Sequence, residues 1–240
     1  MSVGRVPGPP SRGGGGLGAT TLSTYLARGQ SLAGLSADSG WAFDDFTQEG
    51  SETVPLGWLK SPAGTGTTHS QVAGVGGGAV RLTSGATANS IIELFGQSGI
   101  ISNITTSRWY CAGRCRVQTV PDAQTVATIG VADFALTNGI TVGFIGAMDA
   151  THFVLQFDGL RGGTKVSFTA GIDTAFHTFE MWGTGSAVVN AMIDGGGQIS
   201  GTQAAAPADS IQQYLECRNG TTAANQNLDV DWYFVMGARS

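Results

Sequence analysis

The sequence predicts an all-β fold, an antiparallel β-sandwich preceded by an extended, glycine- and proline-rich N-terminal arm. Three observations favour this prediction. Short stretches between residues 108 and 237 alternate apolar with polar residues, glycine, asparagine or aspartate occupies each break, and no long helical pattern interrupts the series. Strands that bury one face produce such an alternation, and turn residues at these intervals are typical of sandwiches and barrels.

The first 36 residues differ from the rest. Residues 1–18 read MSVGRVPGPPSRGGGGLG and offer too little apolar surface to offset the entropy of ordering. We therefore expect an extended arm that a neighbouring subunit holds in place. Residues 19–36 form a connector in which Leu22, Tyr25 and Leu26 have helical spacing. A turn or two of helix and a loosely packed linker are both consistent with this connector.

The remaining residues, 37–240, are predicted to form one sandwich. It begins at the segment WAFDDFTQEG, which starts with Trp41, and continues through a loop-rich segment around Trp58. The spacing of about one strand per 8 to 12 residues fits a single large β domain. We expect the later strands at residues 74–82, 90–95, 109–117, 125–132, 140–148, 152–158, 164–170, 177–183, 187–193, 214–218 and 228–238.

Glycine punctuates these strands, with 38 copies in 240 residues. Three dipeptides, Asn138-Gly139, Asp158-Gly159 and Asp194-Gly195, have the composition of hairpin turns. Turns of this composition usually require positive φ angles. We expect each dipeptide to close a hairpin in this way.

Composition excludes several classes of function. Charged residues make up 12% of the chain, the net charge is −5, and no basic cluster occurs, so direct binding to nucleic acid is not expected. No apolar run approaches the roughly 20 residues that span a bilayer, and the N-terminus lacks the apolar core of a secretion signal. We therefore expect a protein without membrane attachment.

Three cysteines, Cys111, Cys115 and Cys217, do not form a disulfide framework of the secreted type. On one strand Cys111 and Cys115 would share a face but stand roughly 13 Å apart, too far for a bridge. Reduced thiols are the preferred interpretation. A bridge from Cys217 to one of the other two remains an alternative.

Several segments together indicate a family resemblance. THFVLQFDG, GTKVSFTAGIDTAFHTFEMWGTG and AVVNAMIDGG, with the opening DDFTQEG and LGWLK and the closing LDVDWYFVMGAR, lie within residues 41–238. This region resembles the concanavalin A-like, laminin-G-like jelly-roll superfamily, so the resemblance implies a jelly-roll sandwich. Relatives with this fold include lectins, carbohydrate-binding modules, glycoside hydrolases and bacteriophage virion proteins, and the fold alone does not choose among them.

Enzymatic activity is not expected. The endoglucanase branch of the superfamily carries its carboxylates on one strand as Glu-x-Asp-x-x-Glu or a close variant. No such motif occurs, and Glu180 and Glu216 stand alone on their predicted strands. The three histidines, His69, His152 and His177, have no partners at metal-ligand spacing. His177, among aromatic residues, is expected to be packed or hydrogen-bonded within the sandwich.

Calcium is the only cofactor for which we identify candidate ligands in the sequence. The resemblance implies that the first and last strands pair, and calcium prefers the carboxylate oxygens that such a meeting would supply. The alternative is that these aspartates cap turns and solvate strand ends. The candidate ligands are Asp44, Asp45, Asp229 and Asp231.

Two non-enzymatic functions follow from these expectations. The first is a bacteriophage capsid decoration or cement protein, assembled in the host cytoplasm. It would bind on the virion to the major capsid protein or other subunits, as a homo-oligomer for which a trimer is one option. Its arm and connector would provide the contacts. The residues expected to do so are Val3, Arg5, Val6, Pro9, Arg12, Leu17, Leu22, Tyr25 and Leu26.

The second function is a carbohydrate- or receptor-binding module of a phage head or tail fibre. Such a module needs an exposed aromatic platform with amide partners, because sugar rings stack on aromatic faces. Trp58, Trp182 and Asn225 are the candidates for this platform. Most tryptophans of the chain are nevertheless expected to be core or interface anchors.

Overall fold

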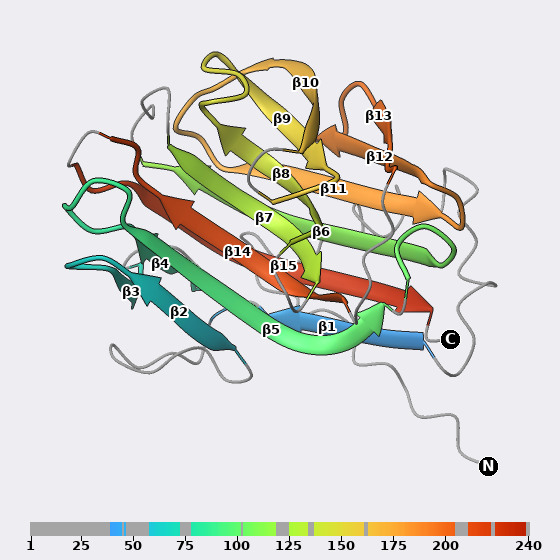
Figure 1. The fold of residues 1–240 in the computed structure, drawn as a ribbon, viewed down its shortest axis with the longest axis horizontal. Helices are drawn as coiled ribbons and strands as arrows, with labels where there is room; N and C mark the ends of the chain where they lie inside the picture. The colour runs from blue at the N-terminus through green and yellow to red at the C-terminus, as the bar shows by residue number, and fades with distance from the viewer. Residues whose placement is uncertain are drawn as a thin grey trace.

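The computed structural model describes residues 39–44, 46, 58–72, 78–101, 103–118, 125–133, 137–160, 163–204, 211–221 and 224–238. Within these ranges all regular structure is β, in fifteen strands. The strands form two antiparallel sheets packed face to face (Figure 1). The predicted all-β sandwich is confirmed, whereas the predicted arm and connector, residues 1–36, lie outside the described residues.

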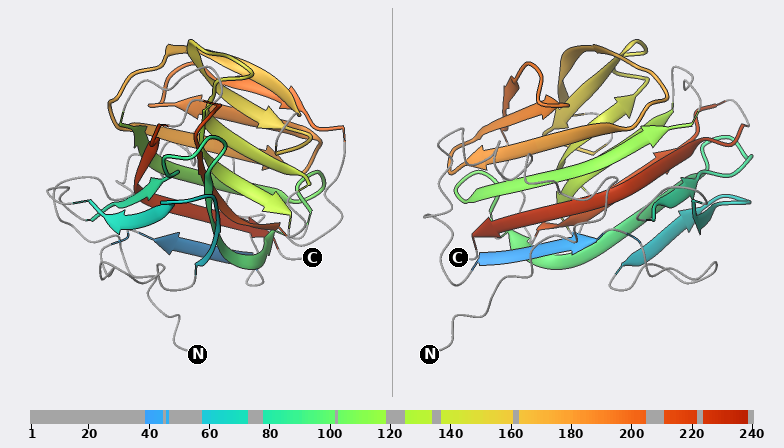
Figure 2. Two further views of the ribbon diagram at one scale, coloured as in Figure 1. Left: turned by 60° about the vertical axis from the view of Figure 1, so that its left-hand side comes forward. Right: turned by 180° about the vertical axis from the view of Figure 1, so that it is seen from behind.

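Sheet A has the strand order β13-β12-β11-β6-β15-β4-β3, and β1 also pairs with β15. Seen from behind in Figure 2, β1 lies beside β15, so the first and last strands of the domain are neighbours. The strands of this sheet are β1 Ser39–Asp44, β3 Thr68–Gln71, β4 Val80–Thr83, β6 Arg108–Val117, β11 His177–Thr184, β12 Val188–Ile193, β13 Ile199–Thr202 and β15 Asn227–Ala238.

Sheet B has the order β10-β9-β8-β7-β14-β5-β2. Its central strands are buried along their whole length, as the burial of every residue of β7 and β8 shows. The strands are β2 Leu59–Ala63, β5 Ile91–Ile101, β7 Val126–Asp133, β8 Gly139–Ile145, β9 His152–Phe157, β10 Thr164–Gly171 and β14 Ile211–Arg218. Three short edge strands, β2, β3 and β13, were not predicted from the sequence.

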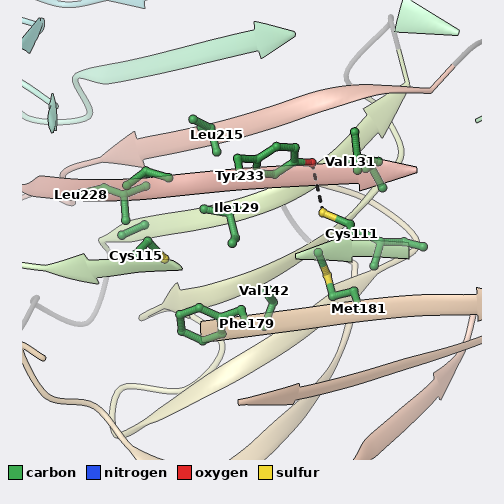
Figure 3. Close-up of a cluster of buried hydrophobic side chains, with 14 of the residues drawn as sticks. Cys111, Cys115, Ile129, Val131, Val142, Phe179, Met181, Leu215, Leu228 and Tyr233 are labelled. Atoms are coloured by element: carbon green, nitrogen blue, oxygen red, sulfur yellow. Dashed lines mark hydrogen bonds between the residues drawn. The ribbon is translucent and has the colours of Figure 1, made fainter. Parts of the chain in front are cut away.

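One core lies between the two sheets, and strand alternation decides which side chains enter it. On β11, Phe179 and Met181 face this core while Glu180 and Trp182 point to the other side of sheet A, as predicted. Figure 3 shows Phe179 and Met181 close to Val142 of sheet B. The predicted inward set on β9, Phe153, Leu155 and Phe157, is confirmed as well.

A β-bulge in β15 breaks the alternation once. The register of β15 against β6 shifts between Val230 and Trp232. Val230 and Tyr233 both belong to the core, so the two residues between them, Asp231 and Trp232, share the outer face. A bulge places two residues opposite one and re-aims a side chain in this way.

The predicted turns hold in two of three cases. Asp158 and Gly159 have positive φ angles of 64° and 146°, and Asp194 and Gly195 have 50° and 70°. Asn138 and Gly139 lie at the β7–β8 hairpin, as predicted, but neither has a positive φ angle, so that part of the prediction was wrong. The β7–β8 turn depends instead on Asp133, whose carboxylate accepts hydrogen bonds from the backbone and side chains of Thr137 and Asn138. Side-chain acceptors of this kind replace turn glycines.

Candidate functional site

The outer face of sheet B carries two acids directly opposite each other. Glu93 on β5 and Glu216 on β14 are register partners, which brings their side chains onto the same side of neighbouring strands. Tyr214, two residues before Glu216, shares that face. These three side chains form the carboxyl–tyrosine cluster.

One hydroxyl joins the members of the carboxyl–tyrosine cluster. The Tyr214 hydroxyl oxygen lies 2.9 Å from Oε1 of Glu93 and 2.7 Å from Oε2 of Glu216. Burial, followed by the two acids, raises the pKa of Tyr214 well above its usual value. The tyrosine therefore keeps its hydrogen at neutral pH and joins the two acids through one hydroxyl group.

The same face continues as a row of polar side chains across β7, β8 and β9. Thr128, Thr141 and Gln156 are each 1% exposed. Thr141 Oγ1 donates to Gln156 Oε1 at 3.3 Å, while Thr128 Oγ1 and Gln156 Nε2 have no hydrogen-bond partner among the described residues. The prediction that Gln156 faces away from the core is confirmed, although the residue is buried on that outer face as well.

A pair of facing acids is the chemical equipment of a glycosidase, but these two acids lack the accessibility that the reaction needs. Glycosidases admit a sugar between their two carboxyl groups, whereas here the Tyr214 hydroxyl lies between Glu93 and Glu216. In addition, Glu93 is 4% exposed, Glu216 is 1% exposed and Tyr214 is fully buried. Sequence reasoning missed this pair because it compared acids along one strand, whereas these acids meet across two.

The outer face of sheet A carries acids in a different setting. Asp229 on β15 is opposite Arg116 on β6 and Arg81 on β4. Its carboxylate accepts from Arg81 Nε at 2.7 Å and Nη2 at 3.0 Å, and from Arg116 Nε at 3.0 Å. Gln118 Nε2 adds a bond of 2.7 Å. Asp229 is 0% exposed, and the two arginines lie over it.

Three further residues complete this surface. We call it the arginine ladder, and it consists of Arg81, Arg114, Arg116, Asp229, Asp231 and Phe176. Arg114 pairs with Asp231, the outward residue of the β15 bulge. The guanidinium carbons of Arg114 and Arg116 lie 4.7 Å and 4.4 Å from the centroid of the Phe176 ring. Such stacking is a favourable cation–π contact. Phe176 is half-buried, so part of the ladder reaches solvent.

The calcium prediction is wrong for Asp229, whose two carboxylate oxygens accept hydrogen bonds from Arg81, Arg116 and Gln118. Asp231 shares its face, as expected, and Oδ2 of Asp231 pairs with Arg114. Asp44 lies opposite Tyr233, two positions along β15 from Asp231, and Asp45 lies outside the described residues. In the described ranges, no group of three or more His, Cys, Asp or Glu side chains is arranged to hold a metal ion.

The predicted sugar platform is also contradicted by burial. Trp58 is 6% exposed and packs in the core against Phe46 and Tyr233. Trp182 is 2% exposed on the opposite side of sheet A, next to Trp232. Asn225 is exposed in the β14–β15 connection. The structure therefore does not bring these three residues together, and the aromatic residue that accompanies exposed donors is Phe176, which sequence reasoning did not select.

His177 is packed and hydrogen-bonded, as predicted. Its Nδ1 lies 2.6 Å from Asp194 Oδ2, and its Nε2 lies 2.8 Å from Asp173 Oδ1. Phe153 packs edge-on against the imidazole. Burial lowers the pKa of His177, but the hydrogen bonds to Asp194 and Asp173 outweigh this effect and raise it overall. The bond from His177 in turn lowers the pKa of Asp173.

The three thiols are free and buried, so the alternative of a Cys217 bridge is wrong. Burial raises the pKa of Cys111 to about 12, even though its thiol donates to the Tyr233 hydroxyl at 3.1 Å (Figure 3). Burial likewise raises the pKa of Cys115 and Cys217. None of the three has the lowered pKa of a nucleophile.

The nine residues expected to contact a capsid, all within residues 1–36, lie outside the described residues. None of the described residues belongs to a helix long and apolar enough to cross a bilayer. The candidate functional surface is therefore the arginine ladder of sheet A, because its donors reach solvent and the polar row of sheet B does not.

Comparisons with known proteins identify the fold. No family model and no curated protein matches the sequence. Among solved structures, the Emp47p carbohydrate recognition domain is similar with a TM-score of 0.56 at 10% identity, covering 87% of this chain and 99% of that chain. Peanut lectin has a TM-score of 0.53 at 10% identity, covering 83% of this chain and 97% of that chain. This chain has a lectin-like jelly-roll fold.

The lectin-like jelly roll also occurs among enzymes. A glycosyl hydrolase family protein from Mycobacterium fortuitum has a TM-score of 0.54 at 12% identity, covering 81% of this chain and 98% of that chain. At these identities the likeness concerns the fold alone. The function must therefore be argued from the sites described above.

Proposed function

We propose that this lectin-like jelly roll is a non-enzymatic carbohydrate-binding module. The observation that carries the proposal is the arginine ladder, where the Phe176 ring and planar guanidinium donors lie together at the surface. Sugar sites combine an apolar or aromatic surface with a few fixed polar groups. The three arginine side chains are 27–32% exposed, which makes them available to a ligand.

The non-enzymatic part of the proposal is supported by the carboxyl–tyrosine cluster. Two carboxylates can hydrolyse a glycosidic bond only if the sugar and a water reach them. Glu93 and Glu216 share one hydroxyl and are almost completely buried. We therefore expect the protein to bind glycans and leave them intact.

A glycan array with the purified chain tests this proposal. We expect saturable binding to a subset of glycans and no release of reducing ends on prolonged incubation. Phe176→Ala should abolish or strongly weaken binding, since it removes the only ring that both Arg114 and Arg116 contact among the described residues. Leu59→Ala, at a 68% exposed residue on the edge of sheet B, is the control and should bind normally. A blank array or continuing hydrolysis would reject the proposal.

A second candidate is the virion decoration or cement protein. The specific observation in its favour is composition, with 12% charged residues, 38 glycines and a glycine- and proline-rich stretch at residues 1–18. A surface poor in charge suits burial against neighbouring subunits, because few ions then need desolvation. In this proposal the chain sits on a capsid as a homo-oligomer, anchored by residues of its arm.

Deletion of residues 1–18 tests the second candidate. The truncated chain should keep its β-sheet circular dichroism spectrum and fail to attach to purified phage capsids. Attachment of the truncated chain at full strength would contradict the role of the arm. Failure of the full-length chain to attach to any capsid would reject the candidate as a whole.

A further inference from the structure

We propose that the arginine ladder is a binding site for the carboxylate groups of an acidic polysaccharide, such as a polyuronate. This inference rests on the proposed carbohydrate-binding function and names its class of ligand. The ladder crosses sheet A from Phe176 beside β11 through Arg116 and Asp229 to Arg81 on β4. It therefore presents a surface that spans four neighbouring strands.

The arginines have hydrogen-bond donors left over after their internal pairing. Arg116 donates only from Nε to Asp229, and Arg114 only from Nη1 to Asp231. Both terminal nitrogens of Arg116, and Nε and Nη2 of Arg114, make no hydrogen bond to a described residue. A guanidinium carries five N–H donors in a planar fork that fits a carboxylate bidentately. The ladder thus has unused forks at its surface.

These forks are held in place before any ligand arrives. Asp229 fixes Arg81 and Arg116 from below and is itself 0% exposed. Phe176 stacks against Arg114 and Arg116 from the side. Ordering a long side chain on binding costs free energy, and an arginine that is already ordered avoids this cost. The ladder is therefore preorganised for an anion.

The local charge also favours an anion. Three arginines face two aspartates in the ladder, which leaves one positive charge in a chain whose net charge is −5. Of the nearby acids, Asp173 and Asp194 both bind His177, and Glu180, on the outer face of β11, is buried and accepts a hydrogen bond from Tyr110. An acidic partner is consequently attracted to the exposed guanidinium groups of the ladder.

The spacing of the arginines favours a repeating anion over a single one. Arg114 and Arg116 are two residues apart on β6, roughly 7 Å along the strand. The backbones of Arg116 and Arg81 lie on either side of β15, about two strand spacings or 10 Å apart, and their side chains converge on the carboxylate of Asp229. A chain of sugar carboxylates can contact several of these cations at once, and such multivalent binding raises the overall affinity.

Binding of trigalacturonate to the full chain tests the proposal. Arginine side-chain NMR signals of Arg114 and Arg116 should shift with trigalacturonate and not with maltotriose, a neutral trisaccharide. Arg116→Gln should weaken trigalacturonate binding about tenfold or more, the loss expected for a charge-assisted contact. Arg116→Lys keeps the positive charge but lacks the planar fork of donors, so this variant should recover only part of the lost affinity for trigalacturonate. Arg108→Gln, at the exposed start of β6, is the matched control and should bind normally.

The outcomes separate this site from the proposed function. Array binding that survives Arg116→Gln, with the arginine signals unmoved, keeps carbohydrate binding and overturns the site. Shifts with trigalacturonate on a blank array keep the anion site and reject the glycan function. If inorganic sulfate competes as tightly as trigalacturonate, the site recognises a single oxyanion, and the polysaccharide assignment is overturned. Melting temperatures of all variants establish that each one is folded.

Discussion

The two outer faces of the sandwich both bury acids, and they stabilise them in different ways. On sheet A, Asp229 and Asp231 are neutralised by arginines. On sheet B, Glu93 and Glu216 share the hydroxyl of Tyr214. Only the first arrangement leaves donors at the surface, because each guanidinium has more N–H groups than its aspartate uses. The difference explains why one face presents free donors to solvent while the other is closed.

The largest effect on stability is expected when the two arginines that pair with Asp229 on sheet A are removed. Arg81→Gln combined with Arg116→Gln leaves the fully buried Asp229 without a cation and should lower the free energy of unfolding by about 3–5 kcal/mol. Adding Asp229→Asn should restore most of this loss, since the buried charge is then gone. Urea denaturation measures both changes. A double variant as stable as the parent would contradict the role assigned to the ladder.

A smaller effect is expected on sheet B from Tyr214→Phe. Loss of the shared hydroxyl leaves two buried acids facing each other, and stability at pH 7 should fall by about 1–3 kcal/mol. Tyr110→Phe on sheet A is the matched control, because its hydroxyl donates to one acid, Glu180, at 2.8 Å. That variant should lose only about 1 kcal/mol.

A second substitution sharpens the same test. Glu216→Gln added to Tyr214→Phe leaves a single buried acid at this position and should restore part of the lost stability, measured by urea denaturation. No recovery would show that the two acids do not interact through the tyrosine.

The smallest effect is expected at the first residue of β11, from His177→Gln. The pKa of His177 is raised in the folded protein, so its contribution is fully present below about pH 6.5 and is lost as the pH rises through the folded value. We expect a loss of up to about 1 kcal/mol at pH 5.5, because its partners Asp173 and Asp194 are half-exposed. At pH 9 the variant and the parent should unfold alike. His152→Gln, at a more exposed histidine, is the control.

Much of the fold could be predicted from the sequence, because strand alternation is a local signal. The inward and outward residues of β9 and β11 follow directly from it. The short edge strands β2 and β3 could not be predicted in this way, since β2 is mostly exposed and contains Pro62, which leaves no alternation to detect. A proline that cannot donate is tolerated on an edge strand.

The candidate site was less predictable than the fold. Asp229 and Asp231 were recognised as sharing a face, but their partners Arg81, Arg114 and Arg116 come from other strands whose register no local pattern reveals. The pairing of Glu93 with Glu216 was not predicted for the same reason, because these residues are neighbours only across β5 and β14. The sugar platform required Trp58 and Trp182 to be exposed, and that prediction was wrong. Large aromatic side chains on half-buried strands gain more from packing than from exposure.

The buried cysteines have a consequence for where this protein can operate. A disulfide forms through the thiolate, and Cys111, Cys115 and Cys217 all have raised pKa values that keep almost no thiolate at neutral pH. Burial also keeps the three sulfur atoms away from oxidants in solution. The β-sandwich therefore owes none of its covalent structure to the redox state of its surroundings, and we expect these thiols to react with alkylating reagents only when the protein unfolds.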